Sequence, residues 1–300
     1  MNIMGCDIIL ECDIDSVSSL LRSISTKIKK QNIAARLTIV LSNNTNSLTI
    51  NEKGNQLIIK LEKDFFKDFE KNKWIIVQQV VRFLSYLNLK YQGNFILLHG
   101  SCAIRNQNSF LFCDFYNNVG KTTASLFLGI NNIYIEDEFV ILDQKNMEVS
   151  GLGIEQSIHL RTDTICFLLS KYNELGIKNA REEIFVSPTD LCMKKANNSK
   201  LNHLVVPLKK RITQSVILKS EDLIEHLVFS HIVKLLYRGF DRFDVFCEKI
   251  KPDAQYLDAL KKVSQDFEIE HLKRKMTKEV SISILEFDSF EEMYEKVSRL

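Results

Sequence analysis

Alternating apolar and polar residues divide the first 92 positions into short strands and two helices. Residues 16–30 and 74–87 have the spacing of amphipathic helices, and in the second of these Ile76, Val80 and Phe83 share one face. The runs with strand character are 3–12, 37–41, 48–50 and 57–59. Polar residues at 51–55 separate the last two runs as a hairpin connection would. We therefore predict a small N-terminal α+β lobe over residues 1–92.

The pattern after residue 92 predicts an α/β core over residues 93–220. Apolar runs with the character of strand, helix and strand follow one another as far as Leu142, and 204–207 is a late core strand. One more strand is expected over 214–218. The stretch 170–200 is polar and broken, which makes it the best candidate for a mobile or partner-contacting segment.

Residues 221–300 are predicted to form a helical and α+β extension packed on that core. Ser220 is a suitable N-cap for a helix that would run to about residue 237, because acidic residues occupy its first turn. A final strand over 281–287 then precedes a C-terminal helix.

Composition and charge narrow the class of protein. The chain has 300 residues, of which 45% are hydrophobic and 26% charged, as in ordinary globular proteins. Its 40 basic and 38 acidic residues leave a net charge of +2, which gives no general attraction to nucleic acid. The chain contains no run of about 18 apolar residues, so no membrane span is predicted. With no secretory signal visible, the seven scattered cysteines fit reduced thiols in a cytoplasmic protein, and no zinc site is expected.

The segment from Leu97 to Leu142 holds the most informative chemistry. Val119-Gly120-Lys121-Thr122-Thr123 is the back half of a phosphate-binding loop, and it leads into the helical run 123–128. Backbone N–H groups and the dipole at a helix N-terminus attract anions. A lysine supplies a point charge for the outer phosphates, and the hydroxyl after it can bind magnesium. Lys121 and Thr122 fit these two roles.

The loop departs from the full G-x-x-x-x-G-K-[ST] pattern, because Phe115 stands where the first glycine belongs. Asn117 and Asn118 can adopt left-handed backbone conformations and so replace missing glycines in part. The alternative is an ordinary strand–turn–helix in which Gly120 serves the turn and Lys121 is solvated.

Three acids, Glu136-Asp137-Glu138, follow the apolar run that begins at Ile133. At the end of a strand beside a phosphate loop, one carboxylate can hold magnesium and a neighbour can act as general base. Repulsion between adjacent acids would raise one pKa toward the working range. The alternative is a polar, exposed loop after a strand.

The order of these motifs resembles the HPr kinase/phosphorylase and phosphoenolpyruvate-carboxykinase-like P-loop group. It is most similar to the diverse HPr-kinase-like proteins that occur beside peptide-modifying enzymes in bacteria. The matching segments are Leu97–Ala103, Gly120–Thr122 and Glu136–Leu142. Glu148–Ile154 also resembles a signature of the true HPr kinases, whose glutamate assists metal binding. The resemblance implies a P-loop core with a mixed sheet.

The resemblance also implies a role for each matched residue. Lys121 would hold the β-phosphate, and Thr122 and Glu138 would hold magnesium. Asp137 would deprotonate an acceptor hydroxyl, and His99 would lie near the phosphates as a donor or proton shuttle. The residues that would contact the nucleotide are Asn117, Asn118, Val119, Gly120, Lys121, Thr122 and Thr123.

A basic residue after the acidic strand is a further candidate. His159 and Arg161 alternate with apolar residues and are expected to share a strand face. In kinases of this type such a residue often neutralises charge on the transferred phosphoryl group. The alternative is an exposed strand face without a catalytic role.

Together these features predict a phosphotransferase that uses ATP or GTP with Mg²⁺ and phosphorylates a hydroxyl of a peptide, protein or small molecule. Biosynthesis of a peptide natural product is the context that the resemblance suggests. The alternative is a catalytically degenerate nucleotide-binding or scaffold protein that assists a partner enzyme. No nucleic acid or membrane partner is expected. A homo-oligomer is also considered, because true HPr kinases are hexamers.

Overall fold

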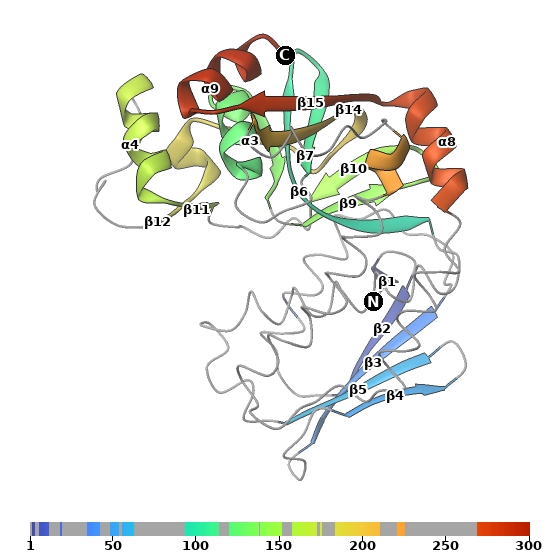
Figure 1. Ribbon diagram of the computed structural model, residues 1–300. Coiled ribbons are helices and arrows are strands. Elements are labelled where there is room, and N and C mark those ends of the chain that lie inside the picture. Colours follow the sequence, from blue (N-terminus) through green and yellow to red (C-terminus); the bar gives the residue numbers. More distant parts are fainter. Residues whose placement is uncertain are drawn as a thin grey trace. The chain divides into compact units, whose positions relative to one another are not determined.

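The computed structural model describes residues 2–3, 6–11, 19, 35–42, 49–53, 56–62, 94–113, 120–137, 139–151, 158–172, 175, 184–210, 221–225 and 269–300. The chain forms two compact units (Figure 1). The first unit comprises Met1–Leu97 and Phe229–Glu268, and the second comprises Leu98–Val228 and Ile269–Leu300. The division into domains over 1–92, 93–220 and 221–300 stays a prediction.

The first unit contains a five-stranded mixed sheet with the order β1-β2-β3-β5-β4. Its strands are β1 (Asn2–Ile3), β2 (Cys6–Glu11), β3 (Ala35–Ser42), β4 (Thr49–Lys53) and β5 (Gln56–Glu62). Strands β2, β3 and β5 run parallel, and β4 is antiparallel to β5. The predicted strands and hairpin are confirmed.

The hairpin of the first unit is tighter than the polar residues 51–55 suggest, because Lys53 already pairs with Gln56. Strand β4 lies at the edge of the sheet, where polar and charged side chains are well tolerated. The predicted helices 16–30 and 74–87 lie outside the described residues, apart from residue 19, which is helical.

The second unit is built on an eight-stranded mixed sheet with the order β13-β8-β6-β7-β14-β10-β9, to which β15 is added beside β14. The strands are β6 (Phe95–Arg105), β7 (Asn108–Cys113), β8 (Ile133–Glu136), β9 (Phe139–Asp143), β10 (Glu148–Gly151), β13 (Lys194–Lys195), β14 (Asn198–Lys209) and β15 (Ser281–Phe287). Both parallel and antiparallel pairs occur, so the predicted α/β class with a mixed sheet is confirmed.

Four strands of this sheet end at the same edge, which we call the carboxyl edge. Strand β6 is antiparallel to both β7 and β8, so β7 and β8 run in the same direction. Strand β14 is parallel to β7, and β15 is parallel to β14. Gly100, in the middle of β6, pairs with Cys113, the last residue of β7. The carboxyl edge is therefore formed by the ends of β7, β8, β14 and β15, with the middle of β6 beside the end of β7.

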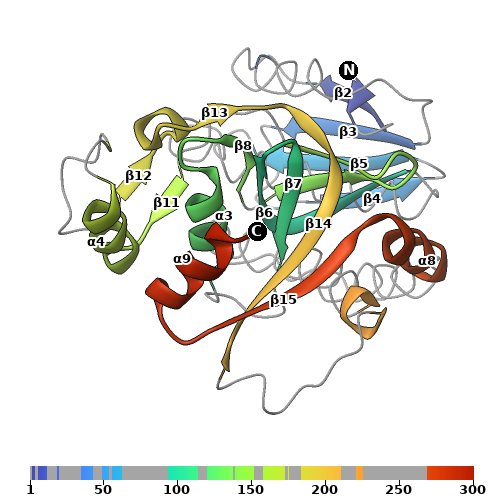
Figure 2. The ribbon, with the colours of Figure 1, turned by 90° about the horizontal axis from the view of Figure 1, so that it is seen from above.

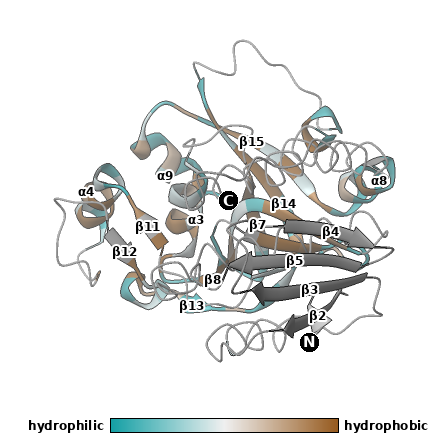
Figure 3. Cartoon of the chain, turned by 90° about the horizontal axis from the view of Figure 1, so that it is seen from below, coloured by the Kyte–Doolittle hydropathy of each residue, from teal (hydrophilic) through white to brown (hydrophobic). Residues whose placement is uncertain are grey.

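Three helices surround a common core with the sheet, namely α3 (Lys121–Gly129), α4 (Thr162–Lys171) and α9 (Phe290–Ser298) (Figure 2). Phe127 of α3 packs against Phe167 of α4 and Tyr294 of α9, with ring centroids 5.1 and 5.4 Å apart. Each such aromatic pair adds about 0.5–1.5 kcal/mol beyond the area that it buries. The apolar colouring of α3 and of neighbouring strands marks this core (Figure 3).

Residues 158–200 carry several short elements beside α4. Strands β11 (Ile158–Leu160) and β12 (Ile184–Val186) form a separate antiparallel pair. The 3₁₀ helix η2 (Pro188–Leu191) begins with a capping box between Ser187 and Asp190. Leu191 is fully buried, so this part of the polar stretch 170–200 packs onto the core.

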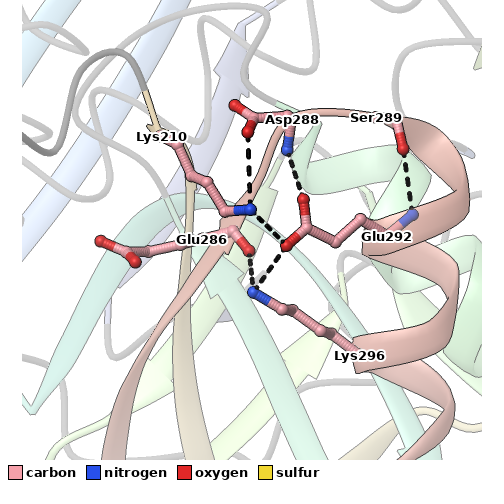
Figure 4. Close-up of polar contacts among 6 residues, drawn as sticks. All are labelled: Lys210, Glu286, Asp288, Ser289, Glu292 and Lys296. Carbon is pink, nitrogen blue, oxygen red and sulfur yellow. Dashed lines mark hydrogen bonds and ion pairs between the residues drawn. The ribbon is translucent and has the colours of Figure 1, made fainter.

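The C-terminal strand and helix are confirmed, and charged side chains hold them to the end of β14 (Figure 4). Lys210 Nζ lies 2.7 Å from Glu292 Oε1 and 3.4 Å from Asp288 Oδ2. Lys296 Nζ lies 3.0 Å from the same Glu292 oxygen. Hydrogen bonding to Lys210, then to the Asp288 N–H and Lys296, lowers the pKa of the Glu292 carboxyl to about 2. These contacts fix the turn between β15 and α9.

The remaining described elements add little to the site. Helix α8 (Ile269–Glu279) precedes β15, and residues 221–225 are helical, as predicted. The predicted strand 214–218 lies outside the described residues. Among the helices that the structure describes, none has the length and apolar composition needed to span a bilayer. Four cysteines are free thiols, two of them buried (Cys102, Cys113) and two exposed (Cys166, Cys192).

Candidate functional site

Gly120 forms the turn from which α3 starts at the carboxyl edge. Its φ of 94° and ψ of 20° lie in the left-handed region, which glycine adopts without strain. Ala124 N–H donates to Gly120 O at 2.8 Å, which is the first hydrogen bond of the helix. The N–H groups of Lys121, Thr122 and Thr123 precede that bond and are those with which a helix N-terminus binds an anion. The predicted helix is confirmed, and it begins two residues earlier than expected.

Lys121 is buried, with only 8% of its surface exposed. The alternative in which this lysine is solvated is therefore wrong. A buried ammonium group costs several kcal/mol unless charged or polar partners surround it. Such a cation at a helix N-terminus is more easily explained by a negatively charged ligand or neighbour than by stability.

Glu136, the last residue of β8, and Asp137, which follows it, are also buried, so neither belongs to an exposed loop. Glu136 is fully buried and Asp137 is 7% exposed. The pairing of β8 with β6 shifts by one residue here, because Ala103 pairs with Tyr134 whereas Cys102 pairs with Glu136. An extra residue of this kind is a β-bulge, and bulges redirect the side chains that follow.

Because of the bulge, the side chains of Tyr134 and Glu136 point in different directions. Tyr134 packs in the core beneath α3. The carboxylate of Glu136 instead lies against β10, where a Cβ on Gly151 would come within 2.6 Å of Glu136 Oε2. Glu136 Oε1 accepts a hydrogen bond from the Asp137 N–H at 3.2 Å. The buried glutamate thus holds the backbone from which Asp137 projects.

Asp137 and Thr122 are in direct contact across the carboxyl edge. Thr122 Oγ1 donates to Asp137 at 3.0 Å from Oδ1 and 3.3 Å from Oδ2. The hydroxyl after the loop lysine therefore contacts the first acid after β8. A hydroxyl and a carboxylate are hard oxygen ligands of the kind that Mg²⁺ prefers, usually together with waters and substrate phosphates. Thr122 and Asp137 fit a magnesium ion in that chemical sense.

The electrostatic environment at the end of β8 is negative. Burial raises the pKa of the Tyr134 hydroxyl well above its ordinary value, and the charges of Asp137 and Glu136 raise that pKa further. A site that disfavours one more negative charge favours a cation. Within the described part of the chain, no group of three or more His, Cys, Asp and Glu side chains could by itself hold a metal ion.

Thr123 and Thr164 connect the start of α3 with the start of α4. Thr123 Oγ1 lies 3.4 Å from Thr164 Oγ1, so this hydroxyl is directed toward α4. Arg161 is exposed and immediately precedes α4, three residues before Thr164. The expectation that Arg161 shares a strand face with His159 is wrong, because β11 ends at Leu160 and α4 begins at once. The side chain of His159 is not among those described.

His99 lies within β6, next to Gly100, which pairs with Cys113 at the end of β7. Its side chain is half-buried. Phe115, Asn117, Asn118, Val119 and Glu138 lie outside the described residues, and their roles stay predictions.

Several residues that support the site were not identified from the sequence. They are Ser101, Ser125, Gly151 and Met293, and each contacts the site from another element. Ser125 is the one polar residue within the run 124–128, which is a signal that could have been used. Met293 carries no such signal, because only the fold brings its side chain against Gly120.

We expect Gly151→Ala to lower the melting temperature by several degrees. The new Cβ would stand 2.6 Å from Glu136 Oε2 and 2.9 Å from the backbone oxygen of Ile135, and overpacking of this kind costs about 1–3 kcal/mol. Thermal unfolding followed by circular dichroism measures the effect. Gly129→Ala is the control, because its Cβ would meet only the flexible side chain of Met193 at 3.3 Å and the Ala103 methyl group at 3.6 Å. A Gly151→Ala protein as stable as the parent would contradict the packing argument.

A comparison of the chain with models of known protein families gives no match, and a comparison with curated proteins gives none either.

Proposed function

We propose that this protein is a phosphotransferase that binds ATP or GTP with Mg²⁺ and transfers the γ-phosphoryl group to a hydroxyl of a peptide, protein or small molecule. The observation that carries the proposal is the contact between Thr122 and Asp137, which joins the N-terminus of α3 to the acidic end of β8 beside the buried Lys121. In open α/β sheets, ligands bind outside the carboxyl ends of the strands, where this contact lies.

The nucleotide would be bound by its phosphates. The N–H groups of Lys121, Thr122 and Thr123, together with the dipole of α3, supply partial positive charge without bulk. The Lys121 ammonium adds a full charge for the β-phosphate. Because the Lys121 residue is largely buried, charge interactions near it are less screened than those of an exposed lysine.

Magnesium would be held by Thr122 and Glu138, and when bound it neutralises charge on the β- and γ-phosphate oxygens. Asp137 would take the proton of the acceptor hydroxyl as that oxygen attacks the γ-phosphorus. The new bond joins the acceptor oxygen to phosphorus, and the bond to the β-phosphate oxygen breaks, so that the nucleoside diphosphate leaves with the electron pair. The Thr122 hydroxyl orients the Asp137 carboxylate in the absence of ligand.

Two basic residues would assist the transfer. Arg161 stands before α4, whose first turn contacts the first turn of α3 through Thr164 and Thr123, so its guanidinium can supply positive charge near the transferred group. His99, within β6 next to Gly100, would donate to a phosphate oxygen or relay a proton.

We further propose that the second unit is an HPr-kinase-like P-loop core that acts in the cytoplasm. The support is the order of motifs, namely His99-Gly100-Ser101, Gly120-Lys121-Thr122 and the acids from Glu136 onward. A peptide-modifying pathway is the proposed context, and it rests on analogy at the level of the family.

Titration of the purified protein with ATP and with GTP, each with and without Mg²⁺, tests the function. We expect one of the nucleotides to bind by isothermal titration calorimetry with a Kd in the micromolar range, and more tightly with magnesium. If neither nucleotide binds under either condition, the phosphotransferase proposal fails. The protein would then be the degenerate or scaffold type, and Phe115 would be the first residue to replace with glycine.

A further inference from the structure

Two serine hydroxyls are buried beneath the contact between Thr122 and Asp137. Ser101 lies on β6 and Ser125 on α3, and neither is exposed to solvent. Their Oγ atoms are in hydrogen-bond contact with each other. Ser125 Oγ also donates to Thr122 O at 3.0 Å, and Ser101 Oγ lies 3.4 Å from Glu136 O as a possible donor. The pair therefore touches the backbone of both residues that lead into the site.

The buried Tyr134 hydroxyl also lies within reach of Ser101. Each serine hydroxyl has one proton. Two arrangements let one serine donate to the other while the second serine donates to a backbone carbonyl. In one arrangement Ser101 donates to Ser125, which donates to Thr122 O. In the other, Ser125 donates to Ser101, which donates to Glu136 O. The 3.0 Å distance to Thr122 O favours the first arrangement, and in both the first turn of α3 is joined to the central strand β6.

Packing alone does not explain this pair. The neighbouring positions Ala103, Ala124 and Leu126 are apolar and fully buried, so alanine at 101 or 125 would suit the same surroundings. A buried hydroxyl is costly unless it is hydrogen-bonded, and a pair of apolar groups of the same shape is often no less stable. Alanine is also the best helix former, which makes serine at position 125 a further cost.

The pair lies between the two segments whose separation sets the distance from Thr122 to Asp137. Thr122 is held through its own carbonyl by Ser125, and Cys102, the residue after Ser101, pairs with Glu136. Asp137 follows Glu136 directly. A displacement of α3 along the sheet would therefore change the distance from the Thr122 hydroxyl to the Asp137 carboxylate.

We propose that Ser101 and Ser125 are positioning residues that fix the first turn of α3, and with it the Thr122 hydroxyl, relative to the end of β8, where the proposed magnesium ligand Glu138 follows Asp137, and so set the magnesium-binding geometry at the carboxyl edge. The proposal rests on the function proposed above. It assigns no contact with the nucleotide to either serine. Loss of either hydroxyl should weaken the magnesium-dependent part of nucleotide binding and leave the magnesium-free part unchanged.

The experiment compares Ser101→Ala and Ser125→Ala with the parent by calorimetric titration of the same nucleotide with and without Mg²⁺. We expect the Kd with magnesium to rise about five- to tenfold in each variant, as for loss of one buried hydrogen bond, whereas the Kd without magnesium stays within about twofold. Ser125→Ala introduces a better helix former, so it should fold even if Ser101→Ala does not.

Ser109→Ala is the matched control. Ser109 is fully buried in the neighbouring strand β7, and its hydroxyl donates to Lys200 O, but it lies at the amino end of that strand. We expect Ser109→Ala to leave both dissociation constants within about twofold of the parent, which shows that loss of a buried serine hydroxyl is not sufficient. A magnesium-specific loss in Ser109→Ala equal to that in the other variants would overturn the proposal.

A second readout does not depend on nucleotide binding. Hydrogen–deuterium exchange of backbone amides should become faster around residues 121–124 and 136–137 in Ser101→Ala and Ser125→Ala, and not in Ser109→Ala. Unchanged exchange in both variants overturns the positioning role whatever the nucleotide result. Equal weakening with and without magnesium, or no weakening, also overturns it while the phosphotransferase proposal stands. Failure of the parent to bind any nucleotide overturns the function, and the assignment of a magnesium geometry falls with it.

Discussion

Replacement of Lys121 by alanine is expected to weaken binding of the nucleotide at least about 100-fold, because a charge-assisted contact to phosphate in a buried site is lost. Asp137 and Glu136 stay buried at the site after the substitution, so the site becomes more repulsive toward a polyphosphate. Calorimetric titration with and without Mg²⁺ measures the loss. The far-ultraviolet circular dichroism spectrum verifies that the variant is folded.

Lys200→Ala is the control for that measurement. Lys200 lies near the start of β14, at the opposite end from the carboxyl edge, and its side chain is 65% exposed. Its single ion pair, to Glu279 at 4.0 Å, is of the surface kind that contributes little to stability. We expect nucleotide binding equal to the parent. Parent-like binding by a folded Lys121→Ala protein would contradict the phosphate-loop interpretation.

The local part of the site could be predicted from the sequence because its signals are short in range. The strand, the left-handed turn at Gly120 and helix α3 follow within a few residues of one another, so propensity and turn chemistry are sufficient. The same holds for the strand that ends in Glu136 and Asp137. Burial of Lys121 could not be predicted in this way, since the loop sequence is equally compatible with a solvated lysine.

The supporting part of the site depends on contacts between distant segments. Gly151 gives space to Glu136 across β10, and Met293 packs against Gly120 from a helix that begins at residue 290. The bulge in β8 has no local sequence mark, because a register shift belongs to a pair of strands. At Arg161 the local signal was misleading. The alternation of apolar and polar residues predicted a strand that includes Arg161, but β11 ends at Leu160.

Replacement of Asp137 by asparagine is expected to separate binding from catalysis. Asparagine keeps the size of the side chain and an oxygen that accepts from Thr122 Oγ1, but it cannot take a proton from an acceptor hydroxyl. Loss of a general base typically lowers the rate about 10²–10⁴-fold. Release of nucleoside diphosphate, with water as the acceptor, measures turnover, and calorimetry measures binding. We expect turnover to fall by that factor while the Kd with magnesium changes less than about threefold.

Asp143→Asn is the control for loss of a buried carboxylate. Asp143 is 6% exposed at the end of β9, and its carboxylate accepts from the Lys145 N–H and from Asn146 Nδ2 in the following turn. We expect its turnover to equal that of the parent.

The two readouts together decide which role Asp137 has. Full turnover in Asp137→Asn would remove it as the base. A Kd for nucleotide that rises at least tenfold with magnesium, but not without it, would instead make Asp137 a metal ligand beside Thr122, because an amide oxygen without charge binds Mg²⁺ more weakly than a carboxylate. In that case the base would have to come from the next acid, Glu138, and Glu138→Gln would then give the loss of turnover that is expected here for Asp137→Asn.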